Sequence, residues 1–350
     1  MMLAPVTHIL PLTSILRTRR LSVPGQVLVR TGQKVNAADV IAQATLPAAH
    51  IVLDIRRGLG IPRASEAERY IVRQQGDRLE KGDVIAETGG LFSRLVRAPA
   101  AGEVAAVFGG QVLLRTGDTV VELRAGMTGT IVEIVPEFGA VIEANGALIQ
   151  GVWGNGRTDN GSLVVAAKSP DDELTVEKVD VSMRGAIVLA GHCASAEALR
   201  AGADFSLRGL ILSSMSSSLL PVASRMKYPI LLIEGFGRLP YNQAAFDLLI
   251  TSEKRDISVN GIFNAQDGER PELVIPLPAA GPVTPEVDYF APDQTVRIQG
   301  APYAGKIGKI VQIRQGYCDL PNGLKAQAAD VQLDRDARVT VPLANLEVIE

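Results

Sequence analysis

The sequence predicts a multidomain protein that is mainly β, with a central α/β domain. Its 350 residues are enough for about two to four domains, each with its own core. Aromatic residues make up only 4%, whereas the chain has 34 glycines and 20 prolines, a composition typical of aliphatic cores joined by tight turns. Between residues 181 and 280, short apolar runs alternate with helical segments, which predicts parallel strands joined by helices. We expect four regions, at residues 1–125, 126–180, 181–285 and 290–350.

Composition and cysteine usage exclude several classes of protein. Cys193 and Cys318 lie 125 positions apart, which argues against a disulfide framework and favours a reducing compartment. Pro5 and Pro11 interrupt the N-terminal apolar stretches, so no secretory signal is expected, and no apolar run is long enough for a transmembrane helix. The three histidines lie in separate segments, and the acidic residues have no metal-ligand spacing. We therefore expect a cytoplasmic protein without a bound metal.

The first region contains an internal repeat. The segment from Gly32 to Ala42 aligns without gaps on the segment from Gly76 to Ala86, and six of the eleven pairs are identical or conservatively apolar. Glycine supplies the positive φ of a tight turn, and the apolar residues alternate on either side of it. Each copy is therefore expected to form a strand, a glycine turn and a second strand.

Together with the phrase Ala-Pro-Ala-Ala-Gly-Glu-Val at residues 98–104, these segments resemble the biotinyl/lipoyl-type barrel-sandwich hybrid. The resemblance covers roughly residues 21–125. It implies that the two half-motifs pair in one domain, with residues 43–69 inserted between them as a loop and short helix. In that family a hairpin before the phrase carries the lysine that is joined to biotin or lipoate. Residues 87–97 at this position contain no lysine, so we expect the fold without a cofactor.

Residues 126–180 continue the β pattern and are expected to form a small domain. Short apolar runs predict strands at residues 130–135, 139–143 and 146–150. Trp153 lies in a glycine-rich loop, where it is either a contact residue for a ligand or the aromatic plug of a small sheet. The plug is the commoner role for a lone aromatic residue in a β domain.

The third region has the pattern of a Rossmann-like sheet. Apolar runs predict buried strands at residues 185–191, 209–212 and 229–234, and the intervening patterns predict helices at 195–201, 217–226 and 241–252. Two further runs, at residues 255–260 and 272–275, are expected to add edge strands.

Ligands bind beyond the carboxyl ends of the strands in open α/β sheets, which makes the residues after these strands the candidate site. Hydroxyl residues at a helix start either cap the helix or help it to hold an anion. His192 beside Cys193 would also suit an activated thiolate, although adjacent residues on an extended chain point to opposite sides. No complete catalytic set is present, and ordinary capping and packing remain the alternative. The candidate residues for an anionic ligand are His192, Cys193, Ser195, Ser213, Ser214, Ser216, Glu234, Gly235 and Gly237.

The segments at residues 294–298, 302–310, 329–333 and 341–347 resemble a KOW, SH3-like barrel, a family whose members bind RNA or proteins of transcription and translation. Seven basic and seven acidic residues in residues 290–350 give no net charge, which favours a protein partner over RNA. The candidate contact residues are Tyr303, Lys306, Lys309 and Arg314.

The whole chain has a formal charge of −3, whereas residues 1–73 carry ten basic and four acidic residues, a local charge of +6. Arg17, Arg19 and Arg20 are the centre of this excess. They form either a solvated basic face or a docking surface for an acidic partner, an anionic lipid or nucleic acid.

These features predict a non-enzymatic adaptor or scaffold subunit of a larger cytoplasmic complex, with an anionic ligand at most in the α/β domain. One alternative is a KOW-type RNA-binding factor of transcription or translation. The other is an enzyme that uses His192 and Cys193. The sequence names no partner or ligand and does not set the oligomeric state.

Overall fold

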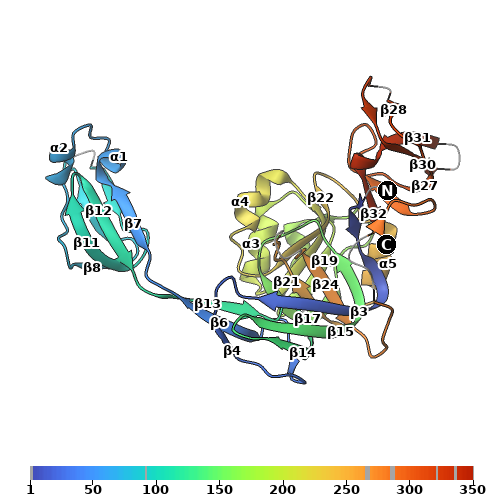
Figure 1. Cartoon of the computed structure of the whole chain (residues 1–350), viewed down its shortest axis with the longest axis horizontal. Helices are drawn as coiled ribbons and strands as arrows, with labels where there is room; N and C mark the ends of the chain where they lie inside the picture. The colour runs from blue at the N-terminus through green and yellow to red at the C-terminus, as the bar shows by residue number, and fades with distance from the viewer. Residues whose placement is uncertain are drawn as a thin grey trace. The chain divides into compact units, whose positions relative to one another are not determined.

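The computed structural model describes residues 3–90, 93–264, 269–283, 288–320, 322–334 and 337–349. Strands account for 47% and helices for 13% of the chain, so the protein is mainly β as predicted. The chain forms two compact units, whose elements are labelled in Figure 1. Unit 1 comprises Met1–Arg20, Val27–Ala42 and Leu123–Glu350, and unit 2 comprises Leu21–Gln26 and Gln43–Glu122. Most of unit 2 is therefore a single insertion into the sequence of unit 1.

Unit 2 is a small β domain with its own core. Its four-stranded sheet has the order β7-β12-β11-β8, and a second sheet pairs β9 with β10. Ile85, Val104 and Leu114 are fully buried between these strands. Residues 43–69 were expected to form a loop and a short helix. The structure has two short helices there, and the strand β7 precedes them. The elements are β7 (His50–Asp54), α1 (Ile55–Leu59), α2 (Ala64–Glu68), β8 (Arg78–Leu79), β9 (Val84–Glu87), β10 (Leu95–Arg97), β11 (Gly102–Phe108) and β12 (Gln111–Thr116).

The first part of unit 1 contains a similar set of strands. The expected break near Gly146 is absent, and β15 runs through it as one strand of 12 residues. Glycine is required there because a Cβ would lie 2.1 Å from the carbonyl oxygen of Ile275. The elements are β3 (Ile9–Arg20), β5 (Lys34–Val35), β14 (Gly129–Val135) and β15 (Gly139–Gln150). The strands β4 (Gln26–Val27), β6 (Val40–Leu46) and β13 (Thr119–Arg124) form a three-stranded sheet, and each has residues in both units.

The repeated segments belong to different units, which corrects the expectation of one domain at residues 1–125. In each unit, the half-motif pairs with a downstream phrase of the form Ala-x-x-x-Gly-x-Val/Ile. The N–H of Gly32 donates to Ile131 (2.7 Å), as that of Gly76 donates to Val104 (2.8 Å). We call residues 16–20, 28–42 and 123–143 copy A, and residues 50–54, 72–86 and 96–115 copy B.

The two copies also share strand register. β5 pairs with β14, and β14 with β15, in the same register in which β8 pairs with β11 and β11 with β12. A bulge interrupts the second ladder at equivalent places, between Ile131 and Glu133 in copy A and between Val104 and Ala106 in copy B. β3 then pairs with β15 as β7 pairs with β12. Copy B is therefore a second example of the same module, inserted within copy A.

The α/β part continues directly from β15, so residues 126–180 do not form a separate domain. The three expected parallel strands are observed as β19, β21 and β22, and β17, which was not predicted as one of them, extends the set in the order β22-β21-β19-β17. β23 and β24 are not edge strands. They lie inside the sheet and join β17 to β15 by antiparallel pairing. The strands are β16 (Trp153–Gly154), β17 (Thr158–Val165), β18 (Glu173–Leu174), β19 (Ile187–Ala190), β20 (His192–Cys193), β21 (Gly209–Met215), β22 (Ile230–Phe236), β23 (Asp256–Asn260) and β24 (Glu272–Pro276).

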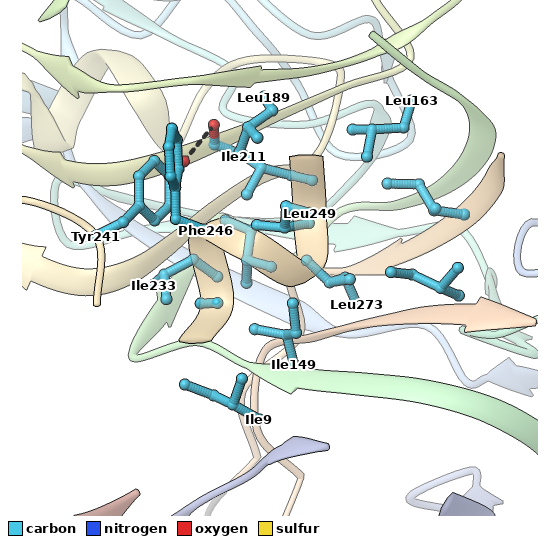
Figure 2. Close-up of a cluster of buried hydrophobic side chains, with 14 of the residues drawn as sticks. Ile9, Ile149, Leu163, Leu189, Ile211, Ile233, Tyr241, Phe246, Leu249 and Leu273 are labelled. Carbon is cyan, nitrogen blue, oxygen red and sulfur yellow. Dashed lines mark hydrogen bonds between the residues drawn. The ribbon is translucent and has the colours of Figure 1, made fainter. Parts of the chain in front are cut away.

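Helices cover this sheet on two sides. On one face Leu163, Leu189, Ile211 and Ile233 pack with residues of α5 (Figure 2). On the other, the buried core includes residues of α3 and α4. The helices expected from 195 and 241 begin after their caps, Ser195 and Asn242, and the helix expected at 217–226 is a 3-10 turn followed by α4, which ends at Ala223. The helices are η1 (Val176–Lys178), η2 (Val181–Met183), α3 (Ala196–Asp204), η3 (Ser217–Leu219), α4 (Leu220–Ala223) and α5 (Gln243–Ile250).

The C-terminal part is a six-stranded sheet with the order β2-β32-β26-β27-β30-β31. Its strand β2 comes from the N-terminus and pairs in parallel with β32, which the sequence pattern does not predict. Among the described residues, no helix is long and apolar enough to cross a membrane. The elements are β1 (Leu3–Ala4), β2 (Val6–Thr7), β25 (Asp288–Tyr289), β26 (Thr295–Ile298), β27 (Ile307–Ile313), β28 (Cys318–Asp319), β29 (Lys325–Ala326), β30 (Ala328–Asp334), β31 (Ala337–Pro342), η4 (Leu343–Asn345) and β32 (Leu346–Ile349).

Candidate functional site

The carboxyl ends of the parallel strands bring His192 and Ser214 together. The Ser214 hydroxyl donates to the carbonyl of Leu239 (2.8 Å) and accepts the Leu239 N–H (3.0 Å). Its one proton is thereby used, so His192 Nδ1, 3.0 Å from the same oxygen, must be the donor. Burial lowers the pKa of His192, with Glu173 opposing this effect and Arg238 adding to it. The site therefore presents a neutral imidazole whose Nε2 accepts hydrogen bonds, which does not favour an anion.

Cys193 lies on the opposite side of the same strand. Its side chain is fully buried within the core that contains α3 and α4, and Sγ lies 3.5 Å from the Ser195 carbonyl. Burial raises the pKa of the thiol to about 11. At neutral pH the thiol stays protonated, and it does not face His192, so the geometry opposes the activated-thiolate alternative.

Three serine residues of the candidate set make contacts within the protein that do not depend on a ligand. Ser195 caps α3 by accepting the N–H groups of Glu197 (3.2 Å) and Ala198 (3.3 Å). Ser213 is completely buried, and Ser216 contacts the Ser218 hydroxyl (3.0 Å). Capping therefore describes the contacts of Ser195 and packing those of Ser213, whereas Ser216 precedes its 3-10 turn without a side-chain cap bond.

The glycine residues shape the loop after β22. Gly235 and Gly237 have φ values of 130° and 98°, in the region that favours glycine. The N–H of Gly237 bonds to the Met215 carbonyl (3.0 Å), which fixes the loop against β21. Nearby, Trp153 makes an edge contact with Phe236 (5.9 Å between centroids) and packs against the hydrophobic core. These contacts favour the packing role for Trp153 over a ligand contact.

Glu234 belongs to a buried polar network that joins the α/β part to the C-terminal sheet. Its Oε1 accepts the backbone and side-chain N–H groups of Asn242 (2.8 and 2.7 Å), and its Oε2 pairs with Arg297. Arg297 also pairs with Glu347 (3.3 Å), whose other oxygen accepts from Thr7 (2.5 Å). Burial raises the pKa of Glu234, and Arg297 opposes that rise. Glu234 therefore stabilises a domain junction instead of lining a ligand site.

The basic surface expected around Arg19 is not available for docking. Arg19 is only 3% exposed and pairs with Glu269 and with Glu272 (3.5 Å), and Arg17 also pairs with Glu272 (2.7 Å). The alternation of β3 places these two side chains on the inner face of copy A, where the acids of β24 and the preceding loop meet them. Arg20 points the other way and is exposed, with its guanidinium 5.2 Å from the ring of Phe138.

In the C-terminal sheet, Arg314 donates to Asp330 (2.9 Å) and to Thr340 (3.0 Å), so it has internal partners. Burial of Asp330 opposes ionisation, but hydrogen bonds from its neighbours outweigh it and lower the pKa to about 2. Lys306 lies 6.0 Å from the ring of Tyr303, and Lys309 is exposed. Tyr303, Lys306 and Lys309 therefore remain available to a partner.

A groove of about 450 Å³ lies in copy A. It forms because β14 pairs with β15 only as far as Glu143, whereas β24 joins the same side of β15 at Gly146. Sequence patterns give no signal for it, because its walls come from four strands. Its polar lining residues are Lys34, Asn36, Thr128, Thr130, Glu143 and Asn145.

The outer face of copy B carries apolar side chains that the described residues of unit 2 leave exposed. Ile51 and Leu53 point into the core, so Val52 between them points outward and is 58% exposed. It lies opposite Leu113 on β12, which in turn lies opposite Ala106 on β11. Phe108, on the same face, is 54% exposed. The sequence pattern does not predict this face, because it does not show that β7 forms a strand whose side chains alternate across the sheet.

The polar residues around this apolar centre are His50, Asp54, Glu103, Gln111 and Arg115, which together give the face an apolar middle and a polar rim. Patches of this kind mark interaction surfaces when they are contiguous.

Comparison with known proteins adds no family. The chain matches no protein-family model, and a search of curated proteins finds no match. In the part of the chain that the structure describes, no three His, Cys, Asp or Glu side chains gather as metal ligands do.

Proposed function

We propose that the protein is a non-enzymatic adaptor or scaffold subunit of a larger cytoplasmic complex, and that unit 2 is the module that binds its protein partner. The observation that carries the proposal is the outer face of copy B. Val52 and Phe108 are exposed there, whereas copy A has Thr18 and Val135 at the equivalent strand positions. A partner that covers an exposed apolar centre removes apolar surface from water, which favours binding.

The resemblance to the biotinyl/lipoyl-type barrel-sandwich hybrid supports the same role. We propose that each copy is such a domain without the modified lysine, and that copy B replaces the cofactor hairpin of copy A. β6 and β13 occupy the position of that hairpin in copy A, and the chain enters and leaves unit 2 through them. In copy B the hairpin runs from β9 to β10 and has no lysine. A Rossmann-like middle part and a KOW, SH3-like C-terminal barrel complete the proposed architecture.

Affinity capture from the cells of origin tests the proposal. We expect the full chain to retain a protein in stoichiometric amount, and Phe108→Lys to lose it because a charge then occupies the apolar centre. Val135→Lys is the matched control, since Val135 is the equivalent residue of copy A, and it should retain the partner. A clean monomer without a stoichiometric partner, or retention by Phe108→Lys, would contradict the proposal.

Thiol labelling tests the enzymatic alternative. We expect Cys193 to react with a thiol reagent far more slowly than Cys318 at pH 7, because it is buried and its pKa is about 11. Mass spectrometry of labelled peptides separates the two sites. Fast labelling of Cys193 at neutral pH would restore the nucleophile hypothesis.

RNA binding is the second candidate function, and one observation favours it. Tyr317 is 74% exposed in the C-terminal part, to which Lys306 and Lys309 also belong, and an exposed ring stacks on bases. Retention on RNA with a negative slope of log affinity against log salt would support this function, and the absence of a slope would exclude it.

A further inference from the structure

β7 is an edge strand of unit 2. Within the described residues it pairs only with β12. The Ile55 N–H bonds to Gly110 and the Thr116 N–H bonds to Ala49, so the odd-numbered residues of this ladder make the bonds to β12. The backbone groups of the even-numbered residues between them point away from the sheet. His50, Val52 and Asp54 therefore offer main-chain donors and acceptors at an open edge.

We propose that two copies of this chain associate through their β7 strands, which pair antiparallel across a two-fold axis at Val52. In this register the Val52 N–H of each copy donates to the Val52 carbonyl of the other. The Asp54 N–H of each copy donates to the opposing His50 carbonyl. The two four-stranded sheets then form one continuous sheet.

The side chains of β7 are complementary in this arrangement. His50 lies opposite Asp54 of the second copy, so an imidazole faces a carboxylate at both ends of the pair, and that carboxylate also pairs with Arg56 (3.0 Å) and caps α1 of its own chain. Val52 faces its own counterpart, and the apolar centre of each outer face becomes one stripe across the dimer. On the inner face, Ile51 lies opposite Leu53, and both are only half-buried at the edge of the core in the isolated unit. Pairing therefore buries apolar surface on both faces of the strand.

Copy A has the same strand but lacks this complementarity. Around Thr18, the residue equivalent to Val52, the same register would place Arg17 opposite Arg19, and like charges directly opposite each other destabilise a pair. The edge of β3 is also covered near its middle, where Ser14 bonds to Pro282 (3.2 Å) and Gly281 (2.9 Å). The proposal therefore applies to β7 alone.

Sedimentation velocity of the full chain over a concentration series tests the proposal. We expect a monomer–dimer equilibrium, and we expect Val52→Lys to raise the dissociation constant by about tenfold or more, because two ammonium groups then meet at the axis. Thr18→Lys places the same charge at the equivalent position of copy A and should leave the constant unchanged. A monomer at every concentration, or equal effects of the two substitutions, would overturn the proposal.

Val52→Pro tests the backbone pairing of β7 separately from the contacts of its side chains. Proline at this position removes an N–H that points away from β12, and edge strands tolerate it for that reason. The circular dichroism spectrum should therefore stay unchanged while the dimer is lost. A folded variant that still dimerises would show that the interface lies elsewhere.

This association does not rest on the proposed adaptor function. Sedimentation uses the purified chain alone, so a failed capture experiment leaves the dimer untouched, and a monomeric chain leaves partner binding by the outer face untouched.

Discussion

Copies A and B share the backbone pairing described above, and the side chains of β3 and β7 differ most between them. The half-motif turns match closely: the Asn36 N–H donates to Asp39 Oδ2 (2.8 Å), and the Glu80 N–H donates to Asp83 Oδ2 (2.9 Å). In copy A, β3 points arginines inward, toward Glu272 of the α/β part. In copy B, β7 has aliphatic residues at those positions. The difference shows how one module is joined to a larger body in one place and closes its own core in another.

The largest effect is expected when the inward arginine of copy A is replaced by the residue of copy B. Arg19→Leu removes the arginine that pairs with Glu269 and leaves buried Glu272 with Arg17, so the loss should be about 3 kcal/mol, the lower end for breaking a buried ion pair. Urea unfolding of unit 1, followed by the fluorescence of Trp153, measures the loss. Arg20→Leu, at an exposed position, is the control and should cost about 1 kcal/mol or less. Equal losses would show that β3 does not join copy A to the α/β part in this way.

An intermediate effect is expected at two equivalent glycines. A Cβ on Gly102 would lie 2.5 Å from the Arg115 carbonyl oxygen, and a Cβ on Gly129 would lie 2.5 Å from that of Glu143. Because both neighbours are backbone atoms, Gly102→Ala and Gly129→Ala should each destabilise their own unit by about 1–3 kcal/mol.

Hydrogen exchange read separately for the two units measures these losses. Gly117→Ala is the control, since a Cβ there meets no atom within 4 Å. A loss in one copy without a similar loss in the other would break the equivalence of the two modules.

The smallest effect is expected at a pair of arginine bonds that the copies share. Arg124 Nη1 donates to the carbonyl of Ala38 (2.6 Å), and Arg97 Nη1 donates to that of Gly82 (2.8 Å). Arg124→Gln and Arg97→Gln should each cost about 0.5–1.5 kcal/mol, as the loss of one hydrogen bond does. Hydrogen exchange in the half-motif turns measures both. A rise in exchange confined to one copy would show that the bond matters only there.

The sequence by itself determined the repeat, the alternation of three parallel strands with helices and the absence of a lysine in the hairpin of copy B. Each of these depends on local pattern: glycine turns, apolar periods and residue identity at a position. The α3 cap at Ser195 and the opposite orientations of His192 and Cys193 also follow from neighbouring residues alone, which is why the sequence arguments about them were sound.

Only the tertiary structure decided which segments pair. The half-motif of copy A pairs with a phrase some ninety residues downstream because copy B is inserted between them. A local sequence pattern does not indicate which distant segment a strand will pair with. The same holds for Glu234, whose partner Arg297 comes from another sheet, and for Arg19, whose charge is neutralised by acids far along the chain. Pairing between distant segments depends on which buried charges and apolar faces are complementary in three dimensions. Composition and spacing therefore predicted the elements, whereas the fold selected their partners.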